Sequence, residues 1–141
     1  MYQKDYILRL IEQFFKFLAE VLNLIKKGEY SEASDRLESS YYEFLREDAA
    51  SFHNIPEDTL TQKLLQEHNF TNGHLEILAE LFNAEAELKF ARGDYPGSLA
   101  FSRKSMIIFE FIDKEYKTYS EERIKKMEEI RKRITKLDLQ H

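Results

Sequence analysis

The feature that most constrains this chain is a helical periodicity that persists along nearly its whole length. Between Asp5 and Lys27, for example, apolar residues recur every three or four positions, the spacing of an amphipathic helix with one buried face. Only 4 glycines and 2 prolines interrupt the 141 residues, and no segment shows the alternation of a strand. The pattern therefore predicts an all-α fold.

Turn residues divide this pattern into helices within a single helical domain over residues 1–141. A second helix is expected to run unbroken from Ser31 to Phe52, because Gly28 ends the first helix and Pro56 follows the second. The expected elements are helical hairpins at about 5–52 and 72–115, an intervening helix at about 57–68 and a C-terminal capping helix at about 119–137.

The two predicted hairpins share part of their sequence. Residues 17–44 and 82–109 are identical at seven aligned positions, several times the number that composition alone would give. The identical pairs are Phe17/Phe82, Ala19/Ala84, Glu20/Glu85, Gly28/Gly93, Tyr30/Tyr95, Ser40/Ser105 and Phe44/Phe109. The repeat predicts that one helix–turn–helix unit occurs twice.

The turn phrases GEY at Gly28 and GDY at Gly93 each follow a large aromatic residue and precede small residues that allow close helix packing. This pattern resembles the tetratricopeptide (TPR) repeat. The resemblance implies a TPR-like antiparallel bundle of five to six helices. Val21 in place of a small residue, and an offset of 65 residues against the usual period of about 34, depart from the TPR pattern.

The opening phrase DYILRLIEQ, followed by the two turn phrases, also resembles a family of small all-helical bacterial proteins of unknown function. That resemblance implies a TPR-like bundle over about residues 4–115 and a bacterial cytoplasmic setting. It supplies no catalytic residue.

Composition excludes several classes of protein. The absence of cysteine rules out disulfides, cysteine zinc sites and thiol nucleophiles, and a net charge of −5 argues against a general nucleic-acid coat. Asp5 and Arg9 interrupt the stretch where a signal peptide would be apolar, and the longest purely apolar run is Met106–Phe109. We therefore expect a cytoplasmic protein with no membrane partner.

No motif in the sequence indicates an enzyme, a metal or a cofactor. There is no glycine-rich phosphate loop, and His68 and His74 lack the spacing of metal ligands. Glu20 and Glu85 occupy equivalent repeat positions, where they could form an acid–base pair. The favoured interpretation is that each lies at a helix edge, in solvent or paired with a cation of a neighbouring helix.

Stacked helical hairpins leave a concave face, formed mainly by the first helix of each pair, and such faces bind peptides. Aromatic and amide side chains beside the predicted core stripes are the candidates for this face. They are Phe15, Asn23, Tyr42 and Asn83.

The predicted C-terminal helix carries a local surplus of cations in an acidic protein. Its basic candidates are Lys125, Lys126, Arg131, Lys132 and Arg133. The favoured interpretation is that these cations form a solvated outer face. The second interpretation is that the apolar residues of the helix dock on a partner, and the third is that the cations contact nucleic acid. Nucleic acid is the least favoured partner, because no aromatic residues interleave with the cations.

The sequence thus predicts a non-enzymatic interaction module or adaptor with a protein or peptide partner. The alternative is a nucleic-acid-associated regulator that uses the basic C-terminal helix. Self-association through the last helix or an exposed hairpin face is a further expectation.

Overall fold

A computed structural model of the chain describes residues 2–117 and 119–139; residues 1, 118, 140 and 141 of the predicted domain lie outside the described ranges. The elements are α1 (Tyr2–Lys26), α2 (Tyr30–Leu45), α3 (Ala49–His53), the 3-10 helix η1 (Glu57–Thr59), α4 (Leu60–Gln66), α5 (Asn72–Ala91), α6 (Tyr95–Tyr116) and α7 (Glu121–Leu139). No strand occurs in these ranges, which confirms the all-α class.

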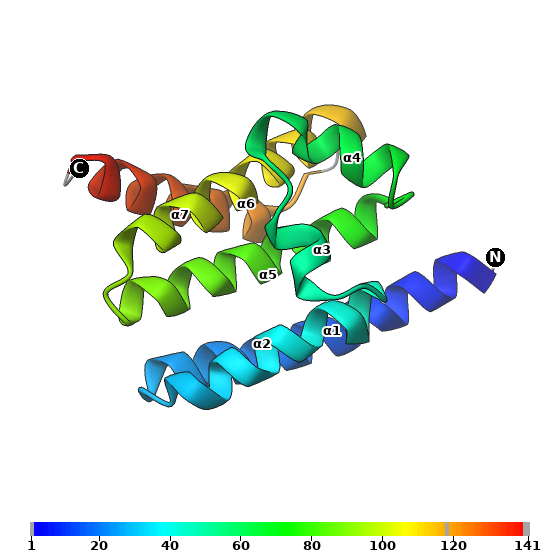
Figure 1. The fold of residues 1–141 in the computed structure, drawn as a ribbon. Helices are drawn as coiled ribbons and strands as arrows, with labels where there is room; N and C mark the ends of the chain where they lie inside the picture. The colour runs from blue at the N-terminus through cyan, green and yellow to red at the C-terminus, as the bar shows by residue number, and fades with distance from the viewer. Residues whose placement is uncertain (1, 118, 140–141) are drawn as a thin grey trace.

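Helix α5 is the centre of the bundle. The α1/α2 hairpin lies along one side of α5, and α6 lies along another side with α7 packed against it (Figure 1). A helix with neighbours on several sides must be apolar around most of its circumference, and α5 is buried at nearly every position from Leu75 to Leu88. The core therefore surrounds α5.

The two hairpin turns have the same geometry. Gly28 and Gly93 both adopt a φ of 82°, the left-handed conformation that glycine reaches without steric cost. In each turn the residue after the glycine donates its N–H to the carbonyl five residues earlier, at 2.9 Å in the first and 2.8 Å in the second. This is the Schellman pattern of a helix C-terminus. The duplicated sequence thus gives a duplicated turn.

Small residues hold α5 and α6 close together, as the repeat predicts. The Ser98 hydroxyl donates a hydrogen bond to the Ala86 carbonyl at 2.8 Å, and the Ser105 hydroxyl donates one to the Ala79 carbonyl at 2.7 Å. Both serines are fully buried. Their hydroxyls are therefore satisfied by backbone of the neighbouring helix.

The prediction of five to six helices was wrong, because the described chain contains seven α-helices. The helix expected at Ser31–Phe52 ends at Leu45, where Arg46 adopts a left-handed φ of 65°. In one straight helix Tyr41 and Phe52 would lie about 16 Å apart along the axis. The break brings their rings to 6.0 Å, and both are fully buried. The separate helix α3 thus allows Phe52 to be buried against Tyr41.

The intervening helix predicted at about 57–68 is also divided. Its first turn is the 3-10 helix η1, and α4 continues from it with Leu60 and Leu64 buried. These residues and α3 cover the side of the core between the two hairpins (Figure 1). The connection between the hairpins is therefore part of the core.

Candidate functional site

A groove lies between α1 and α7, with α5 as its floor. Two neighbouring cavities of about 370 and 360 Å³ occupy successive turns of these helices, and we call them together the α1–α7 groove. The α1 wall is apolar, and its lining residues are Phe15, Leu18, Ala19, Leu22 and Ile25. The α7 wall is charged and mostly cationic, and its exposed residues are Glu122, Lys125, Glu129, Lys132 and Lys136.

The apolar row of α1 continues toward its N-terminus. Leu8 and Ile11 line a further cavity, beside the start of α5. The whole row has alternating spacings of three and four residues, the spacing with which a helix packs along a partner helix. Its members are Leu8, Ile11, Phe15, Leu18, Leu22 and Ile25. Leu8 is 52% exposed and Phe15 36%, so the described helices leave part of this row uncovered.

Acidic residues of α5 form the floor of the α1–α7 groove. Burial raises the pKa of Glu80 to about 7, although Lys126 of α7, with its Nζ 3.6 Å from Oε1, lowers it in part. Burial also raises the pKa of Glu87, and Arg133 opposes that shift. Burial likewise raises the pKa of Glu76, which lines the further cavity beside the start of α5. The floor therefore carries buried carboxylates, and the charge of Glu80 depends on pH near neutrality.

The five basic candidates of α7 divide into two groups. Arg133 donates to the Ser102 hydroxyl at 2.9 Å and also to the Asn83 side-chain oxygen, and Lys126 pairs with Glu80. These two cations therefore hold α7 against α5 and α6. The others of the set, Lys125, Arg131 and Lys132, are exposed.

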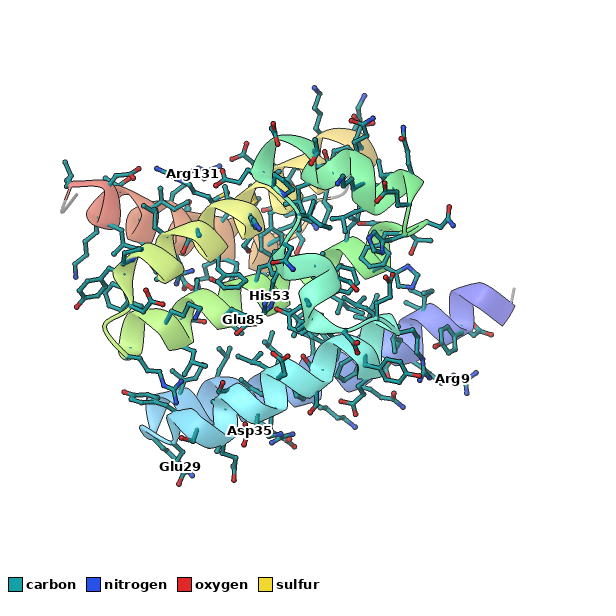
Figure 2. All side chains as sticks on the ribbon, in the orientation of Figure 1. Arg9, Glu29, Asp35, His53, Glu85 and Arg131 are labelled. Carbon is teal, nitrogen blue, oxygen red and sulfur yellow. The ribbon has the colours of Figure 1, made fainter. Side chains whose placement is uncertain are left out.

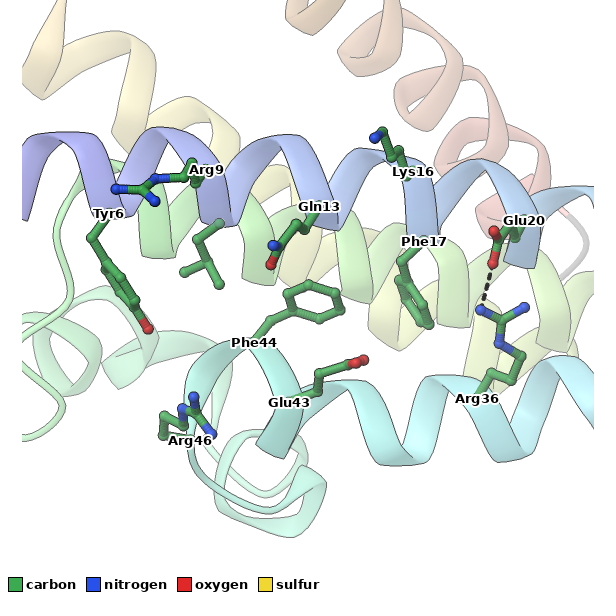
Figure 3. Close-up of a pocket in the computed structure, with 11 residues that line it drawn as sticks. Tyr6, Arg9, Gln13, Lys16, Phe17, Glu20, Arg36, Glu43, Phe44 and Arg46 are labelled. Atoms are coloured by element: carbon green, nitrogen blue, oxygen red, sulfur yellow. Dashed lines mark hydrogen bonds and ion pairs between the residues drawn. The ribbon is translucent and has the colours of Figure 1, made fainter.

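A second groove lies on the other side of α1, between α1 and α2, and has a volume of about 670 Å³ (Figure 3). We call it the α1–α2 groove. Buried Phe17 and Phe44 form its base. The Arg36 guanidinium donates to Glu20 at 2.6 Å and closes one end. Its remaining residues are Tyr6, Arg9, Leu10, Gln13, Lys16, Glu43 and Arg46.

Apart from the two grooves, a cluster of polar residues lies inside the core, where α3 meets α5 (Figure 2). Glu85 accepts a hydrogen bond from the Tyr41 hydroxyl at 2.9 Å, and the same carboxylate oxygen lies 2.9 Å from Nε2 of His53. The Lys104 ammonium donates to the His53 carbonyl at 2.8 Å. Glu85 is 8% exposed and Tyr41 is fully buried, so this cluster joins elements of the core.

The structure separates the two glutamates that the repeat makes equivalent. Glu20 is exposed and pairs with Arg36 of α2, as the favoured interpretation expects. For Glu85 that interpretation was wrong, since its partners are buried Tyr41 and His53. The two carboxylates do not form a pair.

The four residues predicted for one concave face lie in different places. Phe15 lines the α1–α7 groove, while Asn83 is buried beneath it and bonded by Arg133. Asn23 is exposed, one residue beyond the groove-lining Leu22. Tyr42 is exposed on α2, next to Glu43 of the α1–α2 groove. The heptad-like spacing of the apolar row was the signal in the sequence that could have identified Phe15 together with its neighbours.

The rings of His68 and His74 both lie near the Phe70 ring, with centroids 5.7 and 5.2 Å away. Nδ1 of His68 lies 2.5 Å from a Glu47 carboxylate oxygen, whereas Nδ1 of His74 accepts from the Thr71 N–H at 3.2 Å. Among the described residues, no group of three or more metal-ligating side chains is close enough to hold a metal ion.

The fold and its grooves define an all-α protein built from two similar hairpins and an additional C-terminal helix. Comparison with family models, with curated proteins and with solved structures finds no match. None of the described helices combines the length and apolarity that are needed to cross a bilayer.

Proposed function

We propose that this protein is a non-enzymatic adaptor that binds an amphipathic helix of a partner protein in the α1–α7 groove. The observation that carries this proposal is the partly uncovered apolar row of α1 opposite the charged wall of α7. A helix with one apolar side and one charged side would match both walls, and helices commonly bind such grooves through residues spaced three and four apart.

The order of the helices supports a TPR-like arrangement. α1, α5 and α7 run in the same direction beside the groove, because Ile7 approaches Gly73 at their N-terminal ends, and Ile25, Phe90 and Lys136 line one cavity near their C-terminal ends. α2 and α6, which follow α1 and α5 in the chain, run in the opposite direction (Figure 1). In helical-repeat proteins the first helices of successive units line the binding face. On the same resemblance we propose a bacterial cytoplasmic setting.

The charged wall would set the register and direction of the bound helix. Lys125, Glu129 and Lys132 present alternating signs along α7. Charges of alternating sign favour a partner helix with the complementary order and repel the others. Apolar contact with α1 would supply most of the affinity, since exposed ion pairs contribute little.

Site-specific photocrosslinking in the cells that express the protein tests this proposal. A photoreactive phenylalanine replaces Phe15 in one variant and Tyr42 in a matched control, because Tyr42 is an exposed aromatic residue on α2. We expect a protein adduct from position 15 alone, with the crosslink in a partner segment whose apolar residues recur every three or four positions. Equal capture from both positions would contradict the assignment of the groove.

The other functions considered are distinct outcomes of the same experiment. An adduct with nucleic acid would favour a regulator that uses Lys125, Arg131 and Lys132, and an adduct with a second copy would favour self-association. Either result would replace the adaptor proposal. Competition is a further check: added unlabelled native protein should reduce capture, whereas added Phe15→Glu should not, because a charge on the apolar wall should prevent binding.

A further inference from the structure

We propose that the α1–α2 groove is a second docking surface, which binds an acidic segment of a partner protein in extended conformation. It is independent of the α1–α7 groove. At 100° per residue the groove residues Arg9, Gln13 and Lys16 lie on the side of α1 opposite to Phe15 and Leu22. The two surfaces can therefore be occupied at the same time.

The charge of the α1–α2 groove differs from that of the whole protein. Four cationic side chains and two carboxylates line it, a net charge of +2 in a chain whose net charge is −5. Arg36 neutralises Glu20 within the groove, so Glu43 is the one lining carboxylate left to offset the charges of Arg9, Lys16 and Arg46. A local positive surface on an acidic protein attracts anionic partners and repels further copies of the same chain.

The arrangement along the groove indicates the order of residues in the ligand. Tyr6, Arg9 and Arg46 lie at one end, the Phe44 and Phe17 rings lie in the middle, and the Glu20–Arg36 pair lies at the other end (Figure 3). Carboxylates of the bound segment would therefore lie near Arg9 and Arg46. Apolar side chains that follow them would contact the two rings.

The groove suits an extended segment. Its volume of about 670 Å³ lies within the range of about 300–1,000 Å³ that is typical of ligand sites. The Gln13 side chain points into it from α1 (Figure 3). An amide side chain both donates and accepts hydrogen bonds, so it can pair with the exposed backbone of an extended peptide, which a helix would not offer.

Titration of the full-length, isotope-labelled protein with a synthetic probe tests the proposal by nuclear magnetic resonance. The probe is a peptide of three glutamates followed by two leucines, with both ends blocked. We expect saturable shifts of amide signals from α1 and α2 around the groove, and weaker binding at higher salt concentration. The same peptide with glutamine in place of glutamate should not bind.

A pair of double variants separates specific recognition from net charge. Arg9→Gln with Arg46→Asn removes two groove cations, and asparagine tolerates the left-handed backbone of position 46. Lys26→Gln with Lys27→Gln removes the same charge from exposed positions outside the groove lining. We expect about tenfold weaker binding in the first variant and a change of less than about twofold in the second.

Four results would overturn the proposal: no saturable shifts, equal binding of the glutamine peptide, equal weakening in both double variants, or shifts of the same amides by a single-stranded oligonucleotide at lower concentration. The last would identify a nucleic-acid site. Because Phe15→Glu lies on the other side of α1, it should leave the titration unchanged. Failure here is thus distinguishable from failure of the proposed helix-binding groove.

Discussion

At the scale of single residues, the most consequential side chains are the carboxylates of α5. Glu85 is buried, accepts a hydrogen bond from Tyr41 and lies 2.9 Å from His53, whereas Glu80 is buried with a single cation at 3.6 Å. A buried charge stabilises a fold only when its hydrogen bonds compensate for lost hydration. These two glutamates should therefore have opposite effects on stability when they are replaced.

Replacement of Tyr41 by phenylalanine tests the Glu85 cluster. The change removes one hydroxyl and leaves the buried Glu85 oxygen without that donor, so we expect a loss of about 1.5 kcal/mol in the free energy of unfolding. Urea denaturation measures the loss. Tyr42→Phe is the matched control, because the neighbouring ring is 58% exposed, and its effect should stay within about 0.5 kcal/mol. Equal losses would mean that the hydroxyl of Tyr41 contributes nothing specific.

Replacement of Glu80 by glutamine tests the floor of the α1–α7 groove. The pKa of about 7 in the folded protein lies above the value of 4.5 of a free glutamate, so protonated Glu80 favours folding, and its contribution is lost as the pH rises from about 4.5 through 7. We expect Glu80→Gln to stabilise the protein by about 3 kcal/mol at most at pH 8.5, and by less than about 1 kcal/mol at pH 5.

Denaturation curves of Glu80→Gln at a series of pH values provide the measurement. Glu128→Gln on α7 is the control, because Glu128 is exposed and its replacement should show no comparable pH dependence. Destabilisation by Glu80→Gln across the whole range would show that the ion pair with Lys126 outweighs the cost of burial.

Residue-level prediction from the sequence succeeded where local pattern decides and failed where a distant element intervenes. The pairing of Glu20 with a cation of the next helix follows from its place at a helix edge. Glu85 has the same place in the repeat, yet α3 brings His53 against it. The sequence of the repeat carries no sign of that contact, because α3 belongs to the connection between the units.

At the scale of elements, the two glycine turns are the part of the fold most directly encoded in the sequence. Gly28 and Gly93 stand at equivalent repeat positions, and both turns were predicted from them. The break between α2 and α3 was not predicted, because Arg46 is an unusual residue for a left-handed position. The break accompanies the burial of Phe52 beside Tyr41, a tertiary contact that local sequence does not reveal.

The repeat predicts that replacing the turn glycine by alanine lowers the stability of the protein equally at the two turns. At both glycines an added Cβ would meet no atom within 4 Å, so only the left-handed backbone opposes the change. We expect Gly28→Ala and Gly93→Ala each to lower stability by about 1 kcal/mol. Gly28→Asn should recover much of that loss, because asparagine tolerates this conformation. Thermal or urea denaturation would reveal unequal turns as a clear difference between the two alanine variants.

At the scale of the whole molecule, α5 is surrounded by neighbours and α7 is attached along one side. The α1–α7 groove arises from this arrangement, because α1 and α7 both flank α5 without covering the space between them. The all-α class and the apolar sides of the helices could be predicted from periodicity alone. The inward direction of Lys126 and Arg133 could not, since it depends on the acidic floor that α5 presents to α7.

This arrangement predicts a hierarchy of local opening in the native protein. Amide hydrogen exchange should be slowest in α5 between about residues 77 and 88, because those amides lie at the centre of the core and open only when the whole domain unfolds. α7 should exchange faster, since it can detach by losing contacts along one side. Slower exchange in α7 than in α5 would contradict the central role of α5.

Two isoleucines on α7 allow a test of whether α7 detaches separately from α5. Ile130 is fully buried, whereas Ile124 on the same helix is 40% exposed. Ile130→Ala should weaken the docking of α7 by about 3 kcal/mol and speed the exchange of its amides, with a smaller effect on α5. Ile124→Ala should change neither the docking of α7 nor the exchange of its amides. If Ile130→Ala instead accelerates α5 and α7 equally, α7 belongs to the same cooperative unit as the core, and the α1–α7 groove has a rigid wall.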